Sequence, residues 1–342
     1  MKKLRGALIG CGFFAVNHIL AWQELKNVKI IAVCDLQKIK AKKFKDKYKI
    51  PFHYDSIENM FNNHKLDFVD VVTTMETHLS ICKILSKYRV PTSIQKPFAD
   101  NINKAKNIVK LFKKYNTPLM VHENFRWQTP IIKLKNIINK YNLKNPLYAK
   151  ISFKHANPVG YINQKYLYDL DKYLILDVGI HLYDLSRFFM GESLSVYTVS
   201  QNTNKKFKGE TAFTSLLRNK NKSISIVEAS ISSIKHPDRF AQTLVNLEFE
   251  NGSLDLDYNY NIFLHFNNKI KKFNASPRKY SWISKPWDQI QESVINTHKH
   301  FIEYLIEKKE HHTSGKDNIK SLSLVFNSYK SSKLRKEIKS NE

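Results

Sequence analysis

The chain has 342 residues, of which 42% are hydrophobic, and this is enough for two domains that each bury a core. No apolar run reaches the ~18 residues that a membrane helix needs. The lysines that raise the net charge to +26 are spread along the chain and form no single basic patch, which argues against nucleic-acid and membrane partners. Cys11, Cys34 and Cys82 lack metal-type spacing, so we expect reduced thiols in a cytoplasmic protein and no metal site.

The first predicted element is a short apolar strand over residues 7–9 that runs into a glycine-rich turn. Gly10, Gly12 and Ala15 have the spacing G-x-G-x-x-A. Gly10 allows a tight turn, Gly12 lets backbone N–H groups approach a pyrophosphate, and Ala15 lets the next helix pack closely on the strand. We expect a dinucleotide to bind here, at the N-terminus of that helix. The predicted loop consists of Gly10, Gly12, Phe13, Phe14 and Ala15.

A second strand over residues 28–33 ends just before Asp35, about 20 residues after Gly12. A carboxylate at this position accepts hydrogen bonds from the adenosine ribose hydroxyls and repels a 2′-phosphate. The sequence therefore predicts NAD rather than NADP as the cofactor.

Helices and strands continue to alternate as far as Val121, and this alternation predicts a doubly wound Rossmann sheet over residues 1–122. The strand over 68–73 is β-branched on both faces, as expected for a buried parallel strand. The further predicted strands cover 51–54, 91–94 and 118–121, and the helices end near 48, 62, 88 and 115.

Polar residues follow two of these strands. Thr73 and His78 come after one strand, and Gln95 and Lys96 end the next. Because the carboxyl ends of parallel strands meet at one edge, we expect all four beside the cofactor. For His78, and for His122 after the last strand, simple loop polarity is an equally good explanation.

The pattern changes after His122. Alternating strands become frequent, which predicts a second, α+β domain over residues 123–342 with a large, mainly antiparallel open sheet. We expect its last helix to pack back towards the first domain and the charged tail to fray. The predicted strands cover 147–153, 195–201, 212–218, 223–232, 242–248, 252–258 and 261–266, and the helices cover 131–141, 174–189, 290–307 and 317–333.

Three residues have the chemistry of an alcohol dehydrogenation. Asp177 and His181 are four positions apart in a helical pattern, so both project from the same face. A dehydrogenase needs a base for the hydroxyl proton and a cation for the developing alkoxide, and His181 and Lys96 suit these tasks, with Asp177 orienting its neighbours. The alternatives are a surface pair and a solvated lysine, but the surrounding helix is apolar and burial of the pair without purpose would be costly.

Four motifs together resemble the family of glucose–fructose oxidoreductase, inositol dehydrogenase and the rhizopine-catabolism protein, over essentially the whole chain. They are G-x-G-x-x-A at 10–15, T-x-x-x-x-H at 73–78, x-K-P at 95–97 and D-x-G-x-H at 177–181. The resemblance implies an NAD(P)-dependent sugar dehydrogenase that oxidises a carbinol carbon and forms a homodimer or homotetramer through its open sheet.

Carried over by position, Lys96, Asp177 and His181 match the family's catalytic residues, which also contact the substrate. Whether Lys96 or His181 is the final proton acceptor stays open. Gln95 stands where the family usually has Glu, and Thr74 where it usually has Pro.

Phrases such as GCGFFAVNH and VHENFRWQ are most similar to family members that oxidise an aldose such as D-apiose at its anomeric carbon. That similarity implies that Asn124 and Arg126 lie by the substrate. The alternatives are a dehydrogenase of a nucleotide-linked sugar or of inositol, and a dinucleotide-binding sensor without catalysis. The presence of Lys96, Asp177 and His181 argues against the sensor.

Overall fold

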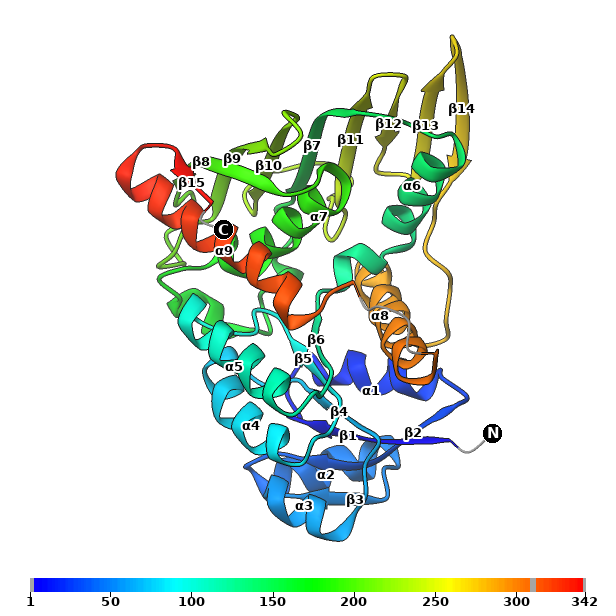
Figure 1. Cartoon of the computed structure of the whole chain (residues 1–342), viewed down its shortest axis with the longest axis vertical. Coiled ribbons are helices and arrows are strands. Elements are labelled where there is room, and N and C mark those ends of the chain that lie inside the picture. Colours follow the sequence, from blue (N-terminus) through cyan, green and yellow to red (C-terminus); the bar gives the residue numbers. More distant parts are fainter. Residues whose placement is uncertain (1–2, 308–311, 341–342) are drawn as a thin grey trace. The chain divides into compact units, whose positions relative to one another are not determined.

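The computed structural model describes residues 3–307 and 312–340, and the chain divides into two compact units (Figure 1). The first unit contains residues 1–123 and 294–320, and the second contains 124–293 and 321–342. We expected residues 123–342 to stay together in a second domain, whereas residues 294–320 cluster with the first unit. Among the described residues, no helix has both the length and the apolar character to cross a membrane.

The first unit is built on a six-stranded parallel sheet with the order β3-β2-β1-β4-β5-β6. The order reverses between β1 and β4, and ligands bind at such a point in open α/β sheets. The strands are β1 (Leu4–Ile9), β2 (Val28–Cys34), β3 (Phe52–Tyr54), β4 (Phe68–Val71), β5 (Thr92–Gln95) and β6 (Leu119–His122).

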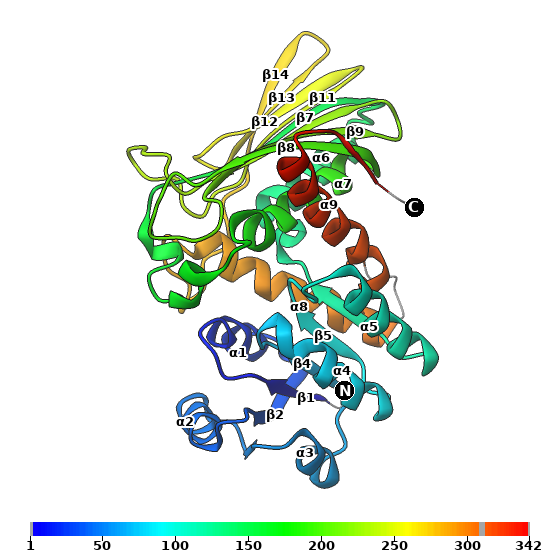
Figure 2. The same ribbon diagram turned by 90° about the vertical axis from the view of Figure 1, so that its left-hand side faces the viewer.

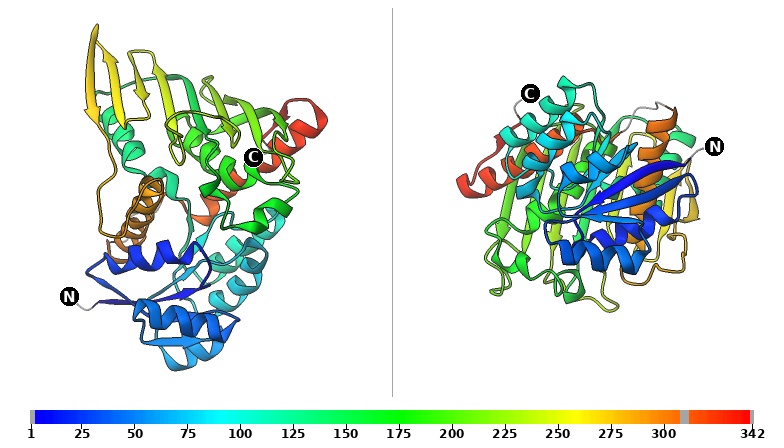
Figure 3. Two further views of the ribbon diagram at one scale, coloured as in Figure 1. Left: turned by 180° about the vertical axis from the view of Figure 1, so that it is seen from behind. Right: turned by 90° about the horizontal axis from the view of Figure 1, so that it is seen from below.

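Helices connect these strands and cover the sheet, as the apolar strand residues require. In Figure 3, α1 lies beside α8, and α4 and α5 lie beside each other away from them. The helices are α1 (Ala15–Gln23), α2 (Lys38–Tyr48), α3 (Ile57–Asn63), α4 (Met75–Lys87), α5 (Ile102–Lys114) and α8 (Asp288–Glu307), of which residues 294–307 belong to this unit. The doubly wound sheet is therefore confirmed.

The segment that returns to the first unit packs on β4 and β6. Phe301 is fully buried, and its ring meets Phe68 edge-on at 5.9 Å between centroids. The backbone N–H of Val121 donates to the Thr313 carbonyl oxygen at 2.8 Å. A Cβ added to Gly315 would lie 2.7 Å from a methyl group of Leu119, so this segment packs closely on β6.

The second unit is built on a nine-stranded sheet with the order β14-β13-β12-β11-β7-β10-β9-β8-β15. Only β10 and β7 pair in parallel, so the prediction of a mainly antiparallel sheet is confirmed. The strands are β7 (Pro146–Lys154), β8 (Ser193–Gln201), β9 (Ala212–Asn219), β10 (Ile224–Ser230), β11 (Leu244–Phe249), β12 (Gly252–Leu256), β13 (Asn261–Phe266), β14 (Lys269–Asn274) and β15 (Ile338–Lys339).

Helices cover one face of this sheet. Figure 2 shows α6 (Thr129–Lys140), α7 (Ile180–Met190) and α9 (Gly315–Leu334) on the same side of the strands. Leu182, Tyr183 and Leu185 of α7 are fully buried, and among the strands α7 packs on β7 and β10. Among the described residues, no helix lies on the opposite face, so that face is open.

The end of the chain differs from the sequence prediction. We expected a frayed tail, but β15 adds to the sheet edge, where Ile338 pairs with Val196. Ile338 is 8% exposed, and Glu337 accepts a hydrogen bond from the Ser195 hydroxyl. One apolar residue and one carboxylate therefore fix a segment whose composition is typical of a loose end.

A buried ion network holds the helical layer of the second unit together. Arg126 donates from Nε and Nη2 to the two carboxylate oxygens of Asp184, at 2.5 and 2.8 Å. Nη1 of Arg187 lies 3.5 Å from Asp184, and the Ser321 hydroxyl donates to the same carboxylate at 2.7 Å. The side chains of Arg126 and Asp184 are 8% and 1% exposed. A buried carboxylate thus faces two guanidinium groups.

Replacing Asp184 with Asn keeps the size of the side chain but removes its charge. We expect the free energy of unfolding to fall by about 3–5 kcal/mol, because the buried Arg126 guanidinium loses the carboxylate that it pairs with, whereas Arg187 keeps its ion pair with Glu192. Urea denaturation followed by circular dichroism measures the change. Asp169→Asn is the matched control, since the Asp169 side chain is 79% exposed. Equal midpoints for the two variants would contradict the role of Asp184.

Candidate functional site

The turn after β1 has the geometry that a pyrophosphate-binding loop needs. Gly10 has a φ of +96°, and a Cβ there would lie 2.4 Å from the Val72 carbonyl oxygen, so only glycine fits. A Cβ on Gly12 would meet nothing within 4 Å, which leaves its backbone open to an anion. Ala15 is fully buried at the first residue of α1. The loop therefore presents the N-terminus of α1 to a phosphate group.

Asp35 fixes this loop from the end of β2. One carboxylate oxygen, Oδ2, accepts the backbone N–H of Cys11 at 2.9 Å, and Oδ1 accepts that of Gln37 at 3.0 Å. The Lys40 ammonium lies 3.7 Å away. The side chain of Asp35 is 13% exposed, so it holds the loop and still borders solvent where a ribose would bind.

The other predicted cofactor residues lie at the same edge of the first unit's sheet. Thr73 follows β4, and its Oγ1 accepts a hydrogen bond from the Thr77 hydroxyl at 2.8 Å. Phe13 is 44% exposed and Phe14 precedes α1. The sheet therefore brings the ends of β1, β2, β4 and β5 to one edge, as expected for a cofactor site.

His78 has partners inside the protein. Its Nδ1 lies 3.2 Å from the Phe98 carbonyl oxygen and its Nε2 lies 3.1 Å from that of Thr73. The side chain is buried, and burial lowers the pKa of His78 to about 4. The neutral ring therefore joins two loops at the cofactor edge and contributes no charge there.

Lys96 leaves the end of β5 next to a cis Lys96–Pro97 bond. Its backbone N–H donates to Oε1 of Gln95 at 2.8 Å, and Gln95 is 8% exposed. This contact uses the Gln95 side chain to hold the backbone that carries Lys96. Lys96 therefore lies in the first unit, at the same sheet edge as the predicted cofactor residues.

Asp177 and His181 lie in the second unit, on a helix that differs from the regular one we expected. Residues Ile175–Gly179 form a π-helical turn that runs directly into α7. The wider turn changes the angular offset between Asp177 and His181 from that of an α-helix. Such insertions occur frequently at functional sites.

Two anchors position an aromatic ring against His181. The imidazole of His181 stacks on Phe125 with 3.9 Å between centroids and 2° between planes. Phe125 belongs to the short 3₁₀ turn Asn124–Trp127. The amide of Asn124 donates to the Ser293 hydroxyl at 2.6 Å, and Arg126 is held by Asp184. Asn124 and Arg126 therefore fix the turn that carries Phe125.

Sequence reasoning missed His155, which directly follows β7. It is 3% exposed, and its ring meets the Phe153 and Phe240 rings edge-on at 5.4 and 4.8 Å. Burial lowers the pKa of His155 to about 4, so the ring is neutral. The one feature of the sequence that could have drawn attention to His155 is its position directly after a predicted strand.

The structure has a turn after β1 that requires glycine at position 10, an open backbone at Gly12 and a carboxylate after β2. On this strand order they define a Rossmann-type dinucleotide-binding protein. The comparison with protein families agrees. Residues 4–123 match the oxidoreductase family with an NAD-binding Rossmann fold, and residues 131–254 match the GFO/IDH/MocA C-terminal domain. The chain belongs to the GFO/IDH/MocA oxidoreductase family.

Relatives match over nearly the whole chain. The D-apiose dehydrogenase of Rhizobium rhizogenes is 36% identical over 97% of this chain and 96% of its own length. The D-apiose dehydrogenase of Paraburkholderia graminis is 34% identical over 97% of this chain and 88% of its own. A crystal structure of an oxidoreductase from Agrobacterium radiobacter, in complex with NAD+, L-tartaric acid and magnesium, superposes with a TM-score of 0.96 at 35% identity, covering 99% and 98% of the two chains. The predicted family, cofactor and enzyme class are confirmed.

Asp35→Ser should weaken NAD binding and reduce the preference for NAD over NADP. The shorter hydroxyl loses the loop contacts and no longer repels a 2′-phosphate, so we expect the KM for NAD to rise at least about 10-fold. Steady-state kinetics with both cofactors measures this. Asp55→Ser, another acid in the first unit with a 43% exposed side chain, is the control. An unchanged ratio of kcat/KM for the two cofactors would contradict the assignment of Asp35.

Proposed function

We propose that the chain oxidises an aldose at its anomeric carbon with NAD, and that D-apiose or a similar sugar is the substrate. The observation that carries this proposal is the identity of 36% with a D-apiose dehydrogenase over 97% of the chain. The motifs on which the resemblance to the family rests also contain Lys96, Asp177 and His181, to which the resemblance gives catalytic roles.

The reaction converts the anomeric C–H and O–H of the sugar into a lactone, with release of a proton, and NAD supplies the acceptor for the hydride. We assign the hydroxyl proton to His181, whose ring is oriented by stacking on Phe125. Lys96 stabilises negative charge on the sugar oxygen, and Asp177 orients the groups around it. Gln95 holds the Lys96 backbone without adding a charge.

Asn124 and Arg126 enter this proposal as positioning residues. Both side chains are nearly buried and are engaged within the second unit by Ser293 and Asp184. We infer that they support substrate binding through the turn that holds Phe125 against His181.

The test is NADH formation at 340 nm by the purified protein, with NAD or NADP and a panel of aldoses, inositols and nucleotide-linked sugars. We expect turnover of D-apiose or another free aldose with NAD. His181→Ala should lower kcat at least about 100-fold while NAD binding persists, because the base is lost.

His64→Ala is the matched control, since His64 contacts Tyr54 and lies outside the proposed catalytic residues and the proposed interface. If the protein turned over only nucleotide-linked sugars or only inositols, that class of compound would be its substrate in place of free aldoses. NAD binding without turnover on any sugar would favour a sensor, and full activity of His181→Ala would refute its role as the base.

We also propose a cytoplasmic location. Cys11, Cys34 and Cys82 are free and buried, as expected in a reducing compartment. Burial raises the pKa of Cys11 and Cys34 to about 12, so neither thiol ionises at neutral pH.

We propose that the open face of the nine-stranded sheet joins copies of this chain. Tyr197, Leu216 and Ile226 lie side by side on β8, β9 and β10. Tyr197 and Leu216 are 39% and 42% exposed, and exposed apolar rows of this kind are typical of protein interfaces.

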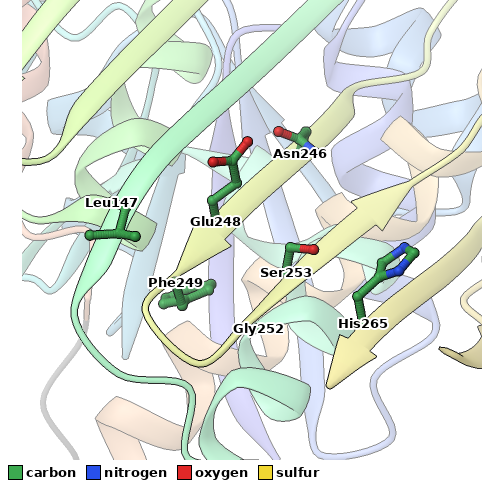
Figure 4. A pocket seen from close by; sticks show the side chains of 7 residues that line it. All are labelled: Leu147, Asn246, Glu248, Phe249, Gly252, Ser253 and His265. Carbon is green, nitrogen blue, oxygen red and sulfur yellow. The ribbon is translucent and has the colours of Figure 1, made fainter. Parts of the chain in front are cut away.

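Farther along the same face of the sheet is a shallow hollow of about 340 Å³ (Figure 4). The residues that line it are Leu147, Asn246, Glu248, Phe249, Gly252, Ser253 and His265.

Light scattering coupled to size-exclusion chromatography tests the homo-oligomer. We expect the wild type to run as a dimer or tetramer and Leu216→Glu to dissociate it, because the new charge would be buried in the apolar contact. Leu334→Glu is the control, since Leu334 is 47% exposed at the end of α9. A monomeric wild type, or an oligomer that Leu216→Glu leaves intact, would contradict the proposal.

A further inference from the structure

Four polar side chains meet in the core of the first unit, and the proposed reaction uses none of them. His18, His122, His298 and Asp70, here called the histidine cluster, are all 0% exposed. They come from α1, β6, α8 and β4, and residues 18 and 298 are 280 positions apart. The cluster therefore joins the N-terminal sheet to the segment that returns at the end of the chain.

The donor atoms of the cluster have the spacing of a metal coordination shell. Nδ1 of His18 lies 2.7 Å from Oδ2 of Asp70, and Nε2 of His298 lies 3.4 Å from that oxygen and 3.3 Å from Nδ1 of His18. One ring nitrogen from each of the three histidines lies within 4.8 Å of the others. Tetrahedral Zn²⁺ with bonds of about 2.0–2.1 Å spaces its ligands roughly 3.3 Å apart, so only small side-chain shifts are needed.

Several atoms of the cluster have no hydrogen-bond partner within the described part of the chain. These atoms are both ring nitrogens of His122, Nδ1 of His298 and Oδ1 of Asp70. Buried polar atoms without partners cost free energy and are rare, so a group of them points to a shared ligand. The carboxylate is also buried among imidazoles, and no lysine or arginine pairs with it among the ion pairs of the described residues.

We propose that the histidine cluster binds one Zn²⁺ through Nδ1 of His18, Nε2 of His298, a ring nitrogen of His122 and Oδ2 of Asp70. Three imidazoles and one carboxylate are a donor set that suits Zn²⁺, and they complete a closed, structural site. The metal compensates the charge of Asp70 and ties α1, β4 and β6 to α8.

Neighbouring side chains support these ligands. The indole Nε1 of Trp22 donates to Oδ2 of Asp70 at 2.7 Å, and the Trp22 ring stacks on His298 with 3.7 Å between centroids and 8° between planes. In this structure the Nε2 amide of Gln95 lies 3.3 Å from Nε2 of His18 and is the donor in that contact, because Oε1 of Gln95 accepts the Lys96 N–H. Ligation through Nδ1 would put the His18 proton on Nε2, so the Gln95 amide does not support this ligand. A carboxylate at position 95 would accept that proton as well as the Lys96 N–H, and such outer contacts raise metal affinity.

The test is metal content, measured by mass spectrometry after the full-length protein is incubated with excess Zn²⁺ and freed of loosely bound metal. We expect one Zn²⁺ per chain and a lower Tm after chelation, because the metal binds the folded state. Co²⁺ as a probe should give the absorption bands of tetrahedral nitrogen and oxygen ligation. It should also change the fluorescence of Trp22.

His122→Phe and His298→Phe remove a ligand but keep a ring, and each should weaken Zn²⁺ binding about 100-fold. His64→Phe is the matched control in the same unit, since His64 contacts Tyr54 and lies outside the cluster. Gln95→Glu should bind Zn²⁺ about 10-fold more tightly.

Three results would overturn the proposal. One is folded wild-type protein that retains no Zn²⁺, and another is Zn²⁺ binding that His122→Phe and His298→Phe leave unchanged, which indicates a surface site. The third is an unchanged affinity in Gln95→Glu, which would exclude ligation through Nδ1 of His18.

Discussion

The closure of the turn after β1 is the constraint on which the cofactor edge depends. The Gly10 N–H donates to the Cys34 carbonyl oxygen at 2.8 Å, and the next N–H, from Cys11, goes to the Asp35 carboxylate. Two adjacent strands are thereby locked at their carboxyl ends, and α1 begins in a fixed direction. Asp35, the residue proposed to recognise the ribose, also holds the turn after β1, so the proposal couples cofactor choice to loop geometry.

Local patterns explain why most of the fold could be predicted from the sequence. The alternation of strands and helices before Val121 and the alternating strands after it determine both sheets, because each pattern reflects which faces are buried. The missed strands β14 and β15 lack that signal. In β14, Lys269–Asn274, the side chains are mostly exposed, and β15 depends on one buried isoleucine at the edge of the sheet.

The parts of the candidate site that could be proposed from the sequence are motifs whose residues lie only a few positions apart. The residues from Gly10 to Ala15, and the pairs formed by Asp177 with His181 and by Gln95 with Lys96, have fixed spacings. The parallel stacking of Phe125 on His181 and the pairing of Arg126 with Asp184 were not predictable, because each joins residues more than 50 positions apart in the sequence. The histidine cluster was not predicted for the same reason, because its residues lie far apart in the sequence. The π-helical turn was not predicted because its composition does not differ from that of an α-helix.

The chain passes between its two units three times, near residues 123, 293 and 320, and the last two passages lie inside α8 and α9. During synthesis on a ribosome, the second unit's segment 124–293 emerges before residues 294–320, which the first unit needs for its core. Nascent chains that stop before residue 294 lack His298 and Phe301, so β4 and β6 would be uncovered in every truncated product. Completion of the nucleotide-binding unit is therefore delayed until residues 294–320 have been translated.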